Sequence, residues 1–123
     1  MQNDKYDWHK VFNSEDEAKK QIKINTMKSF RFGLKKVCIG QNQDGLFAVE
    51  DACPHKMIPL TQGFINEKGE IVCFWHKYVF NAKTGQEKTG KIIRDLKVFP
   101  LENREDGLYV GIKKYKPTDE FSF

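Results

Sequence analysis

The stretch Cys53-Pro54-His55 is followed, after seventeen further residues, by Cys73-Phe74-Trp75-His76. Each segment carries one thiol and one imidazole, which are ligand types that transition metals select. The short spacings, C-x-H and C-x-x-H, suit loops better than the face of a regular helix, where ligands four residues apart would be expected. Two loops of this kind predict a site with four ligands, Cys53, His55, Cys73 and His76.

Zinc accepts the same four ligands, so the kind of metal needs a further argument. Structural zinc sites usually pair like ligands, first C-x₂₋₄-C and then H-x₃₋₅-H. The two mixed segments fit that order poorly. The spacing therefore argues against a structural zinc site, and a zinc-stabilised interaction module stays an alternative.

The two segments and the gap between them resemble the signature of the Rieske family. In that family one iron of a [2Fe–2S] cluster is held by two cysteines and the other by two histidines. The resemblance extends to Leu60, Gly63 and Gly85 and covers roughly residues 8–112. It implies a cluster held by Cys53, His55, Cys73 and His76. The implied fold is all-β, a Rieske-like antiparallel sandwich or barrel with a small cluster-binding subdomain.

The ligand set also sets the charge of such a centre. Two ferric ions, two sulfides and two thiolates sum to zero, so the reduced centre would carry a single negative charge. An all-cysteine cluster would carry two more negative charges in each state. Rieske centres accordingly have potentials of roughly −150 to +300 mV, against about −400 mV for plant-type ferredoxins.

Several positions depart from the family pattern. Ile58 and Trp75 stand where respiratory members have a disulfide, and Lys77 stands where most members have glycine. Residues 89–92 replace a loop that usually contains proline. Phe80 removes a hydroxyl that could donate to the cluster, which favours the lower part of the potential range.

Short apolar runs separated by glycine-bearing turns predict β-strands through most of the chain. The predicted strands span residues 35–40, 46–50, 71–74, 78–81, 97–101 and 108–113. The S-x-x-E pattern of Ser14 and Glu17 is a capping box and predicts a short helix that continues to Gln21. We expect one Rieske domain over residues 1–123, with a core at about 8–112 and a tail at 117–123.

Composition narrows the class of protein. Hydrophobic residues make up 39% of the chain and charged residues 31%, an ordinary balance for a globular protein. No apolar stretch approaches the roughly 20 residues of a membrane span, and no secretory signal is visible, so we expect a cytoplasmic protein without a membrane partner. A net charge of +4 from scattered lysines does not predict nucleic-acid binding.

The third cysteine, Cys38, lies in an apolar run and is expected to be buried.

The function that the sequence favours is a soluble Rieske-type ferredoxin. It would carry single electrons from a reductase to an oxygenase or similar acceptor. The alternative is the small subunit of a nitrite-reductase-like redox enzyme. His9 is the only further histidine and cannot by itself supply the two histidines of a mononuclear iron site. An electron-transfer component is therefore expected rather than a stand-alone catalyst.

Overall fold

The computed structural model describes residues 5–75, 77–90 and 93–114, and nearly all of its regular structure is antiparallel β-sheet. One three-stranded sheet has the order β1-β9-β8, a second β2-β3-β4, and a small third β5-β6-β7. The strands are β1 (Tyr6–Phe12), β2 (Thr26–Phe32), β3 (Lys35–Asn42), β4 (Gly45–Glu50), β5 (Phe64–Ile65), β6 (Ile71–Val72), β7 (Val79–Phe80), β8 (Leu101–Arg104) and β9 (Gly107–Lys113). The predicted all-β class is confirmed.

Short helical segments accompany the sheets. Helix α1 (Glu15–Gln21) begins at Ser14, whose hydroxyl accepts a hydrogen bond from the Glu17 amide at 3.0 Å. The Glu17 carboxylate in turn accepts from the Asn13 amide. The predicted capping box is therefore present, except that Glu17 binds the amide of the residue before Ser14 rather than that of Ser14 itself. The 3₁₀ helix η2 (Leu60–Gln62) follows the first cysteine–histidine segment. Within the described residues, neither helical segment has the length and apolar character needed to span a membrane.

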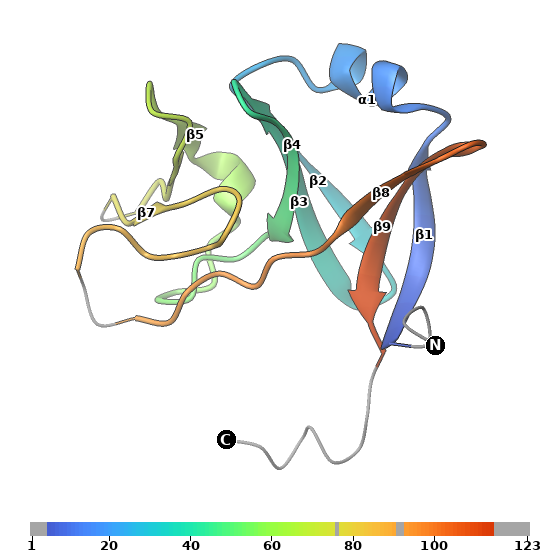
Figure 1. Cartoon of the computed structure of the whole chain (residues 1–123). Helices are drawn as coiled ribbons and strands as arrows, with labels where there is room; N and C mark the ends of the chain where they lie inside the picture. Colours follow the sequence, from blue (N-terminus) through green and yellow to red (C-terminus); the bar gives the residue numbers. More distant parts are fainter. Residues whose placement is uncertain (1–4, 76, 91–92, 115–123) are drawn as a thin grey trace.

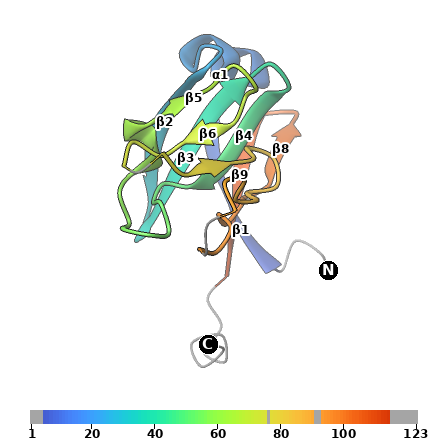
Figure 2. The same ribbon diagram turned by 90° about the vertical axis from the view of Figure 1, so that its left-hand side faces the viewer.

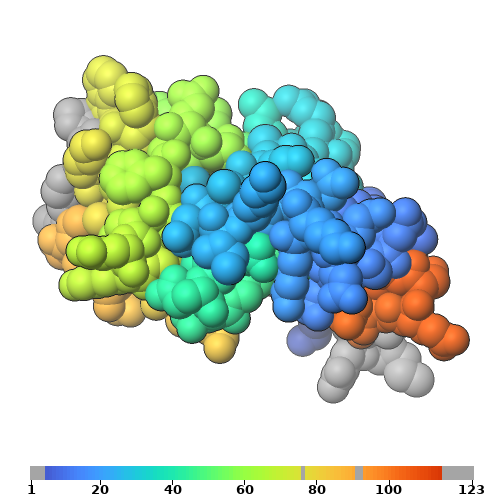
Figure 3. Space-filling view, turned by 90° about the horizontal axis from the view of Figure 1, so that it is seen from above, coloured from blue at the N-terminus to red at the C-terminus, as the bar shows by residue number. Residues whose placement is uncertain are grey.

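The sheet β2-β3-β4 lies in the middle, with the β1-β9-β8 sheet on one side and β5, β6 and β7 on the other (Figure 1). Figure 2 looks onto the small sheet, with β2, β3 and β4 behind it. In the space-filling view of Figure 3, the green and yellow residues of this small sheet and its loops form one end of the molecule.

Strand β3 supplies side chains to two hydrophobic cores, because successive side chains of a strand point to opposite faces. Val37 and Ile39 belong to the core shared with Val110 and Ile112 of β9. Cys38, between them, belongs to the core shared with Ile71 and Phe80 and with both metal-site cysteines. The middle sheet is therefore the rigid base on which the small sheet and its loops are built.

One predicted strand is divided between two partners in the structure. The run at residues 97–101 was expected to be one strand, but the chain changes partner within it. Val98 bridges Val49 and the Phe99 amide donates to Ala48, whereas Leu101 pairs with Val110. Pro100 has no amide hydrogen and stands at this change of partner.

Candidate metal centre

The first metal-site loop, residues 53–58, is closed by its own backbone. The Cys53 amide donates to the Ile58 carbonyl at 2.8 Å, and the Met57 amide donates to the Cys53 carbonyl at 2.6 Å. Met57 has φ 58°, a left-handed conformation that reverses the chain direction within the loop. The loop therefore turns back on itself and presents its side chains from a narrow arch.

The second loop, residues 73–78, repeats this backbone plan in its described part. The Cys73 amide donates to the Tyr78 carbonyl at 2.8 Å, again five residues along the chain. Lys77, the fourth residue after the cysteine, has φ 55° and matches Met57 in the first loop. Lys77 stands where the Rieske pattern usually has glycine, and its left-handed backbone explains why glycine suits that position.

Three of the four predicted ligands converge between these loops. One donor atom each from Cys53, His55 and Cys73 lies within 4.8 Å of the others. The Cys53 Sγ and His55 Nδ1 atoms are 2.9 Å apart. The fourth predicted ligand, His76, lies outside the described residues.

The chemistry of this donor set fits a cationic centre. Both thiols are fully buried, and burial is the main cause that raises the pKa of Cys53 to about 12. A hydrogen bond at His55 opposes this shift, and the neighbouring Cys73 adds to it. A thiolate in this pocket would need positive charge beside it, which bound iron would supply.

Tyr78 covers the imidazole of His55. Their ring centroids are 4.4 Å apart and the ring planes are tilted by 44°. The Nε2 atom of His55 is buried as well. The structure thus places the ring of Tyr78 against a predicted ligand.

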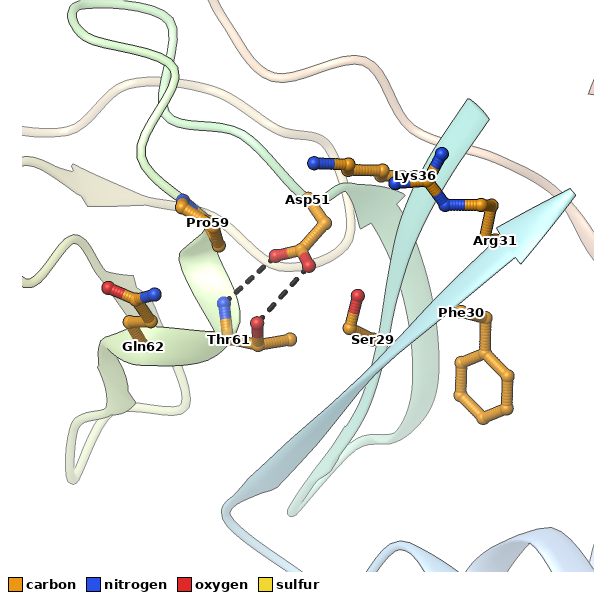
Figure 4. A pocket seen from close by; sticks show the side chains of 8 residues that line it. All are labelled: Ser29, Phe30, Arg31, Lys36, Asp51, Pro59, Thr61 and Gln62. Atoms are coloured by element: carbon orange, nitrogen blue, oxygen red, sulfur yellow. Dashed lines mark hydrogen bonds between the residues drawn. The ribbon is translucent and has the colours of Figure 1, made fainter. Parts of the chain in front are cut away.

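Asp51 fastens the base of the first loop. Its carboxylate accepts hydrogen bonds from the Thr61 amide at 2.9 Å and from the Thr61 hydroxyl at 3.1 Å (Figure 4). The Asp51 amide donates to the Lys36 carbonyl of β3, so the same residue joins the loop to the middle sheet. Asp51 is almost fully buried, and sequence reasoning missed it because its partner lies ten residues away.

The surface around the two loops is unusually apolar for exposed side chains. Met57, Phe64, Phe74 and Trp75 are each between 46% and 61% exposed. Lys56 and Lys77 are exposed in the same loops, and the Lys77 ammonium lies 5.3 Å from the Phe64 ring centroid. We call Lys56, Met57, Phe64, Phe74, Trp75 and Lys77 the tip surface. Apolar groups exposed in this way commonly mark an interaction site.

The third cysteine belongs to the core rather than to the metal site. Cys38 is fully buried, and its burial raises its thiol pKa far above the ordinary range. We expect Cys38→Ala to keep its full complement of iron and to lose about 1 kcal/mol of unfolding free energy, a typical cost for one core substitution. Iron analysis and urea unfolding check this, and a colourless Cys38→Ala protein with native secondary structure would contradict it.

Comparison with known proteins decides the family. A family model described as the Rieske [2Fe–2S] domain matches residues 7–100. The chain belongs to the Rieske [2Fe–2S] family. The cofactor of this Rieske domain is a [2Fe–2S] cluster, and Cys53, His55 and Cys73 are in place to bind it.

Individual relatives agree with this assignment. The chain is 29% identical to ferredoxin CarAc of Metapseudomonas resinovorans over 85 residues, 68% of this chain and 78% of CarAc. A ferredoxin solved in complex with the reduced oxygenase of carbazole 1,9a-dioxygenase matches with TM-score 0.70 and 28% identity, covering 89% of this chain and 97% of that one. A putative NADH-dependent nitrite reductase small subunit from Mycobacterium tuberculosis has the same fold, with TM-score 0.72, 14% identity and coverage of 89% and 98%. Two further curated relatives, a sterol monooxygenase and a dioxygenase ferredoxin subunit, are matched over 17% and 63% of their own lengths.

Proposed function

We propose that this chain is a Rieske-type ferredoxin that carries single electrons between a reductase and an oxygenase or similar acceptor. The observation that carries the proposal is the convergence of Cys53, His55 and Cys73 beneath the exposed apolar tip surface. The relationship with ferredoxin CarAc supports it, as does the likeness to a ferredoxin solved together with an oxygenase. The bound [2Fe–2S] cluster supplies the one-electron redox chemistry.

The chain's own residues would hold that cluster. We propose Cys53 and Cys73 as its thiolate ligands and His55 and His76 as its imidazole ligands, within one domain whose core spans about residues 8–112. The buried cysteines exclude water from one side of the site. The ring of Tyr78 fixes the orientation of His55 from another side.

The tip surface is where the proposed partners would dock. Electron transfer needs a short path between redox centres, and the tip surface, apart from Phe64 of β5, lies in the loops that carry the ligands. Its exposed aromatic side chains supply the apolar contact area that interfaces favour, and Lys56 and Lys77 add positive charge. Partners that present an apolar patch rimmed by carboxylates would fit this surface.

Purified protein tests the function directly. After anaerobic preparation we expect a reddish-brown protein that takes up one electron per cluster and gives a reduced EPR signal with low average g. A reductase and an oxygenase encoded near this protein should then exchange electrons through it. Stable co-purification with a large redox subunit would instead support the nitrite-reductase-like alternative. A colourless, zinc-containing protein would contradict both.

Charge reversal on the tip surface tests the docking site. We expect the double variant Lys56→Glu, Lys77→Glu to slow electron transfer to the acceptor by at least about tenfold at low salt, because like charges then face each other across the interface. The defect should shrink as salt screens the charges. Stopped-flow reduction kinetics measure both effects.

The matched control for the single variant Lys77→Glu carries the same charge change away from the loops. Lys113→Glu lies at the end of β9 and should leave the transfer rate close to that of the unaltered protein. An equal slowing by a single reversal at Lys113 and by one at Lys77 would contradict docking at the tip surface.

We also propose a cytoplasmic location. Cys38, Cys53 and Cys73 are all free thiols, and reducing surroundings keep such thiols available for iron. Cell fractionation followed by iron analysis tests the location.

A further inference from the structure

A buried carboxylate beside the first loop is held by a distant segment of the chain. Glu50, the last residue of β4, is 8% exposed. Its two carboxylate oxygens accept from the Arg94 guanidinium at 2.5 and 2.9 Å, a bidentate geometry typical of strong arginine–carboxylate pairs. The Lys97 amide donates to the same carboxylate at 2.7 Å, and the Glu50 amide donates back to the Lys97 carbonyl. We call residues 93–97 the strap.

The strap also contacts the segment that follows the second loop. The Leu96 amide donates to the Gly85 carbonyl at 2.8 Å, and the Asp95 carboxylate accepts from the Glu87 amide at 2.9 Å. Ile93 packs against the core that contains both metal-site cysteines. The strap thus connects the strand before the first loop with the segment after the second loop. The pair of Glu50 and Arg94 attaches it on the side of the first loop.

No proline stiffens this part of the chain between residues 88 and 97. Fixing an irregular segment costs about 1–2 kcal/mol of conformational free energy per residue, so a strap without regular structure needs strong contacts to stay in place. The arginine–carboxylate pair supplies such a contact. Arg94 is 46% exposed at its side chain, whereas the Glu50 side chain is 11% exposed, so the positive partner covers the negative one from the outside.

The charged pair lies beside the core that holds the metal-site cysteines. Glu50 stands three residues before Cys53 in the chain. Ile93 and Leu96, on either side of Arg94 in the strap, pack in the core that contains Cys53 and Cys73. Charges beside such a core interact more strongly than in water, because the effective dielectric constant is lower.

We propose that Arg94 is a positioning residue for the Rieske centre, because it holds the strap on Glu50. Its positive charge also offsets the negative charge of the Glu50 carboxylate, and the balance of the two charges adjusts the reduction potential of the cluster. Reduction adds one electron to the cluster and hence one negative charge to the site. A fixed positive charge nearby favours that step, and a fixed negative charge opposes it. The inference rests on the cluster of the proposed function and on no particular partner.

Removing the positive charge in one variant and the negative charge in another separates the effect of charge from the effect of detaching the strap. We expect Arg94→Met to leave the Glu50 carboxylate uncompensated and to lower the reduction potential. We expect Glu50→Gln to remove the negative charge and to raise the potential. Each shift should change the one-electron equilibrium by about threefold to tenfold, where tenfold corresponds to 59 mV. Redox titration of the loaded protein alone, followed by its visible spectrum, measures both.

Conservative replacement tests the positioning part. Arg94→Lys keeps the charge but cannot make the bidentate contact with Glu50. It should keep a potential near that of the unaltered protein, yet lose its cluster to a chelator several times faster. Arg94→Met should lose its cluster at least as fast. These chelation rates are read from the decay of the cluster's colour.

A second arginine pair provides the control. Arg104 contacts Glu102 at 2.8 Å on β8, in the sheet on the side of the molecule away from the loops (Figure 1). Arg104→Met should leave both the potential and the chelation rate unchanged. Shifts of the same sign in Arg94→Met and Glu50→Gln would overturn the proposal, as would a shift in Arg104→Met as large as theirs. Failure of the proposed function would look different, since the unaltered protein would then show no redox-active cluster to titrate.

Discussion

Cys53→Ser and Cys73→Ser should each lose essentially all bound iron and acid-labile sulfide. The two Sγ atoms lie with one ring nitrogen of His55 inside one 4.8 Å group, so either substitution removes a soft donor from the centre of the site. A serine hydroxyl is a poor replacement, because iron–sulfur clusters are held by thiolates. We expect the same outcome for His76→Ala. Iron and sulfide analysis and the visible spectrum measure the loss.

The same substitutions should lower stability. A ligand that binds only the folded protein adds RT ln(1 + [L]/Kd) to its stability, about 4 kcal/mol when the ligand is at a thousand times its dissociation constant. Loss of the cluster removes that contribution from the small sheet and its loops. Cys38→Ala is the matched control, since it alters a buried cysteine of the same core without touching a donor. Full iron and sulfide in Cys53→Ser or Cys73→Ser would refute the ligand assignment.

Gly85→Ala should be among the most damaging substitutions outside the ligands. Gly85 has φ +79°, and a Cβ atom there would lie 2.3 Å from the Leu96 carbonyl oxygen. The left-handed backbone costs an alanine roughly 1 kcal/mol, and the collision would push the strap away from the segment that follows the second loop. We expect a total loss of about 3 kcal/mol or more, a large part of the 5–15 kcal/mol that stabilises a typical domain. Urea unfolding of the loaded protein measures it.

Two further glycines separate the causes. Gly33 has a similar φ of +63°, but a Cβ there would meet nothing within 4 Å, so Gly33→Ala should cost only about 1 kcal/mol. At Gly63, φ is −89°, yet a Cβ would lie 2.0 Å from the Val72 carbonyl oxygen, so Gly63→Ala tests the collision by itself. Equal losses for Gly85→Ala and Gly33→Ala would show that the collision has no role.

The local features of this protein could be predicted from its sequence because their signals are local. The two cysteine–histidine segments identified the site, and the turns before Gly45 and Gly107 are present as hairpin turns between paired strands. The capping box at Ser14 placed helix α1. In each case the residues that determine the structure are only a few positions apart.

Features that depend on distant partners could not be predicted in this way. Strand β2 was missed because it lies at the edge of its sheet and its exposed residues break the apolar pattern. The pair of Glu50 and Arg94 joins residues 44 positions apart. Strands β6 and β7 are shorter than predicted, since the chain leaves the small sheet early to form the second loop. Only the packed structure determines these features.

The matching closure of the two loops has a consequence for what a ligand substitution disturbs. The bonds from Cys53 to Ile58 and from Cys73 to Tyr78 join backbone atoms, so they do not depend on the cysteine sulfurs. A serine in place of either cysteine therefore removes a sulfur donor but keeps the amide that closes its loop. The loss of iron in such a variant would report on the ligand itself rather than on the backbone around it.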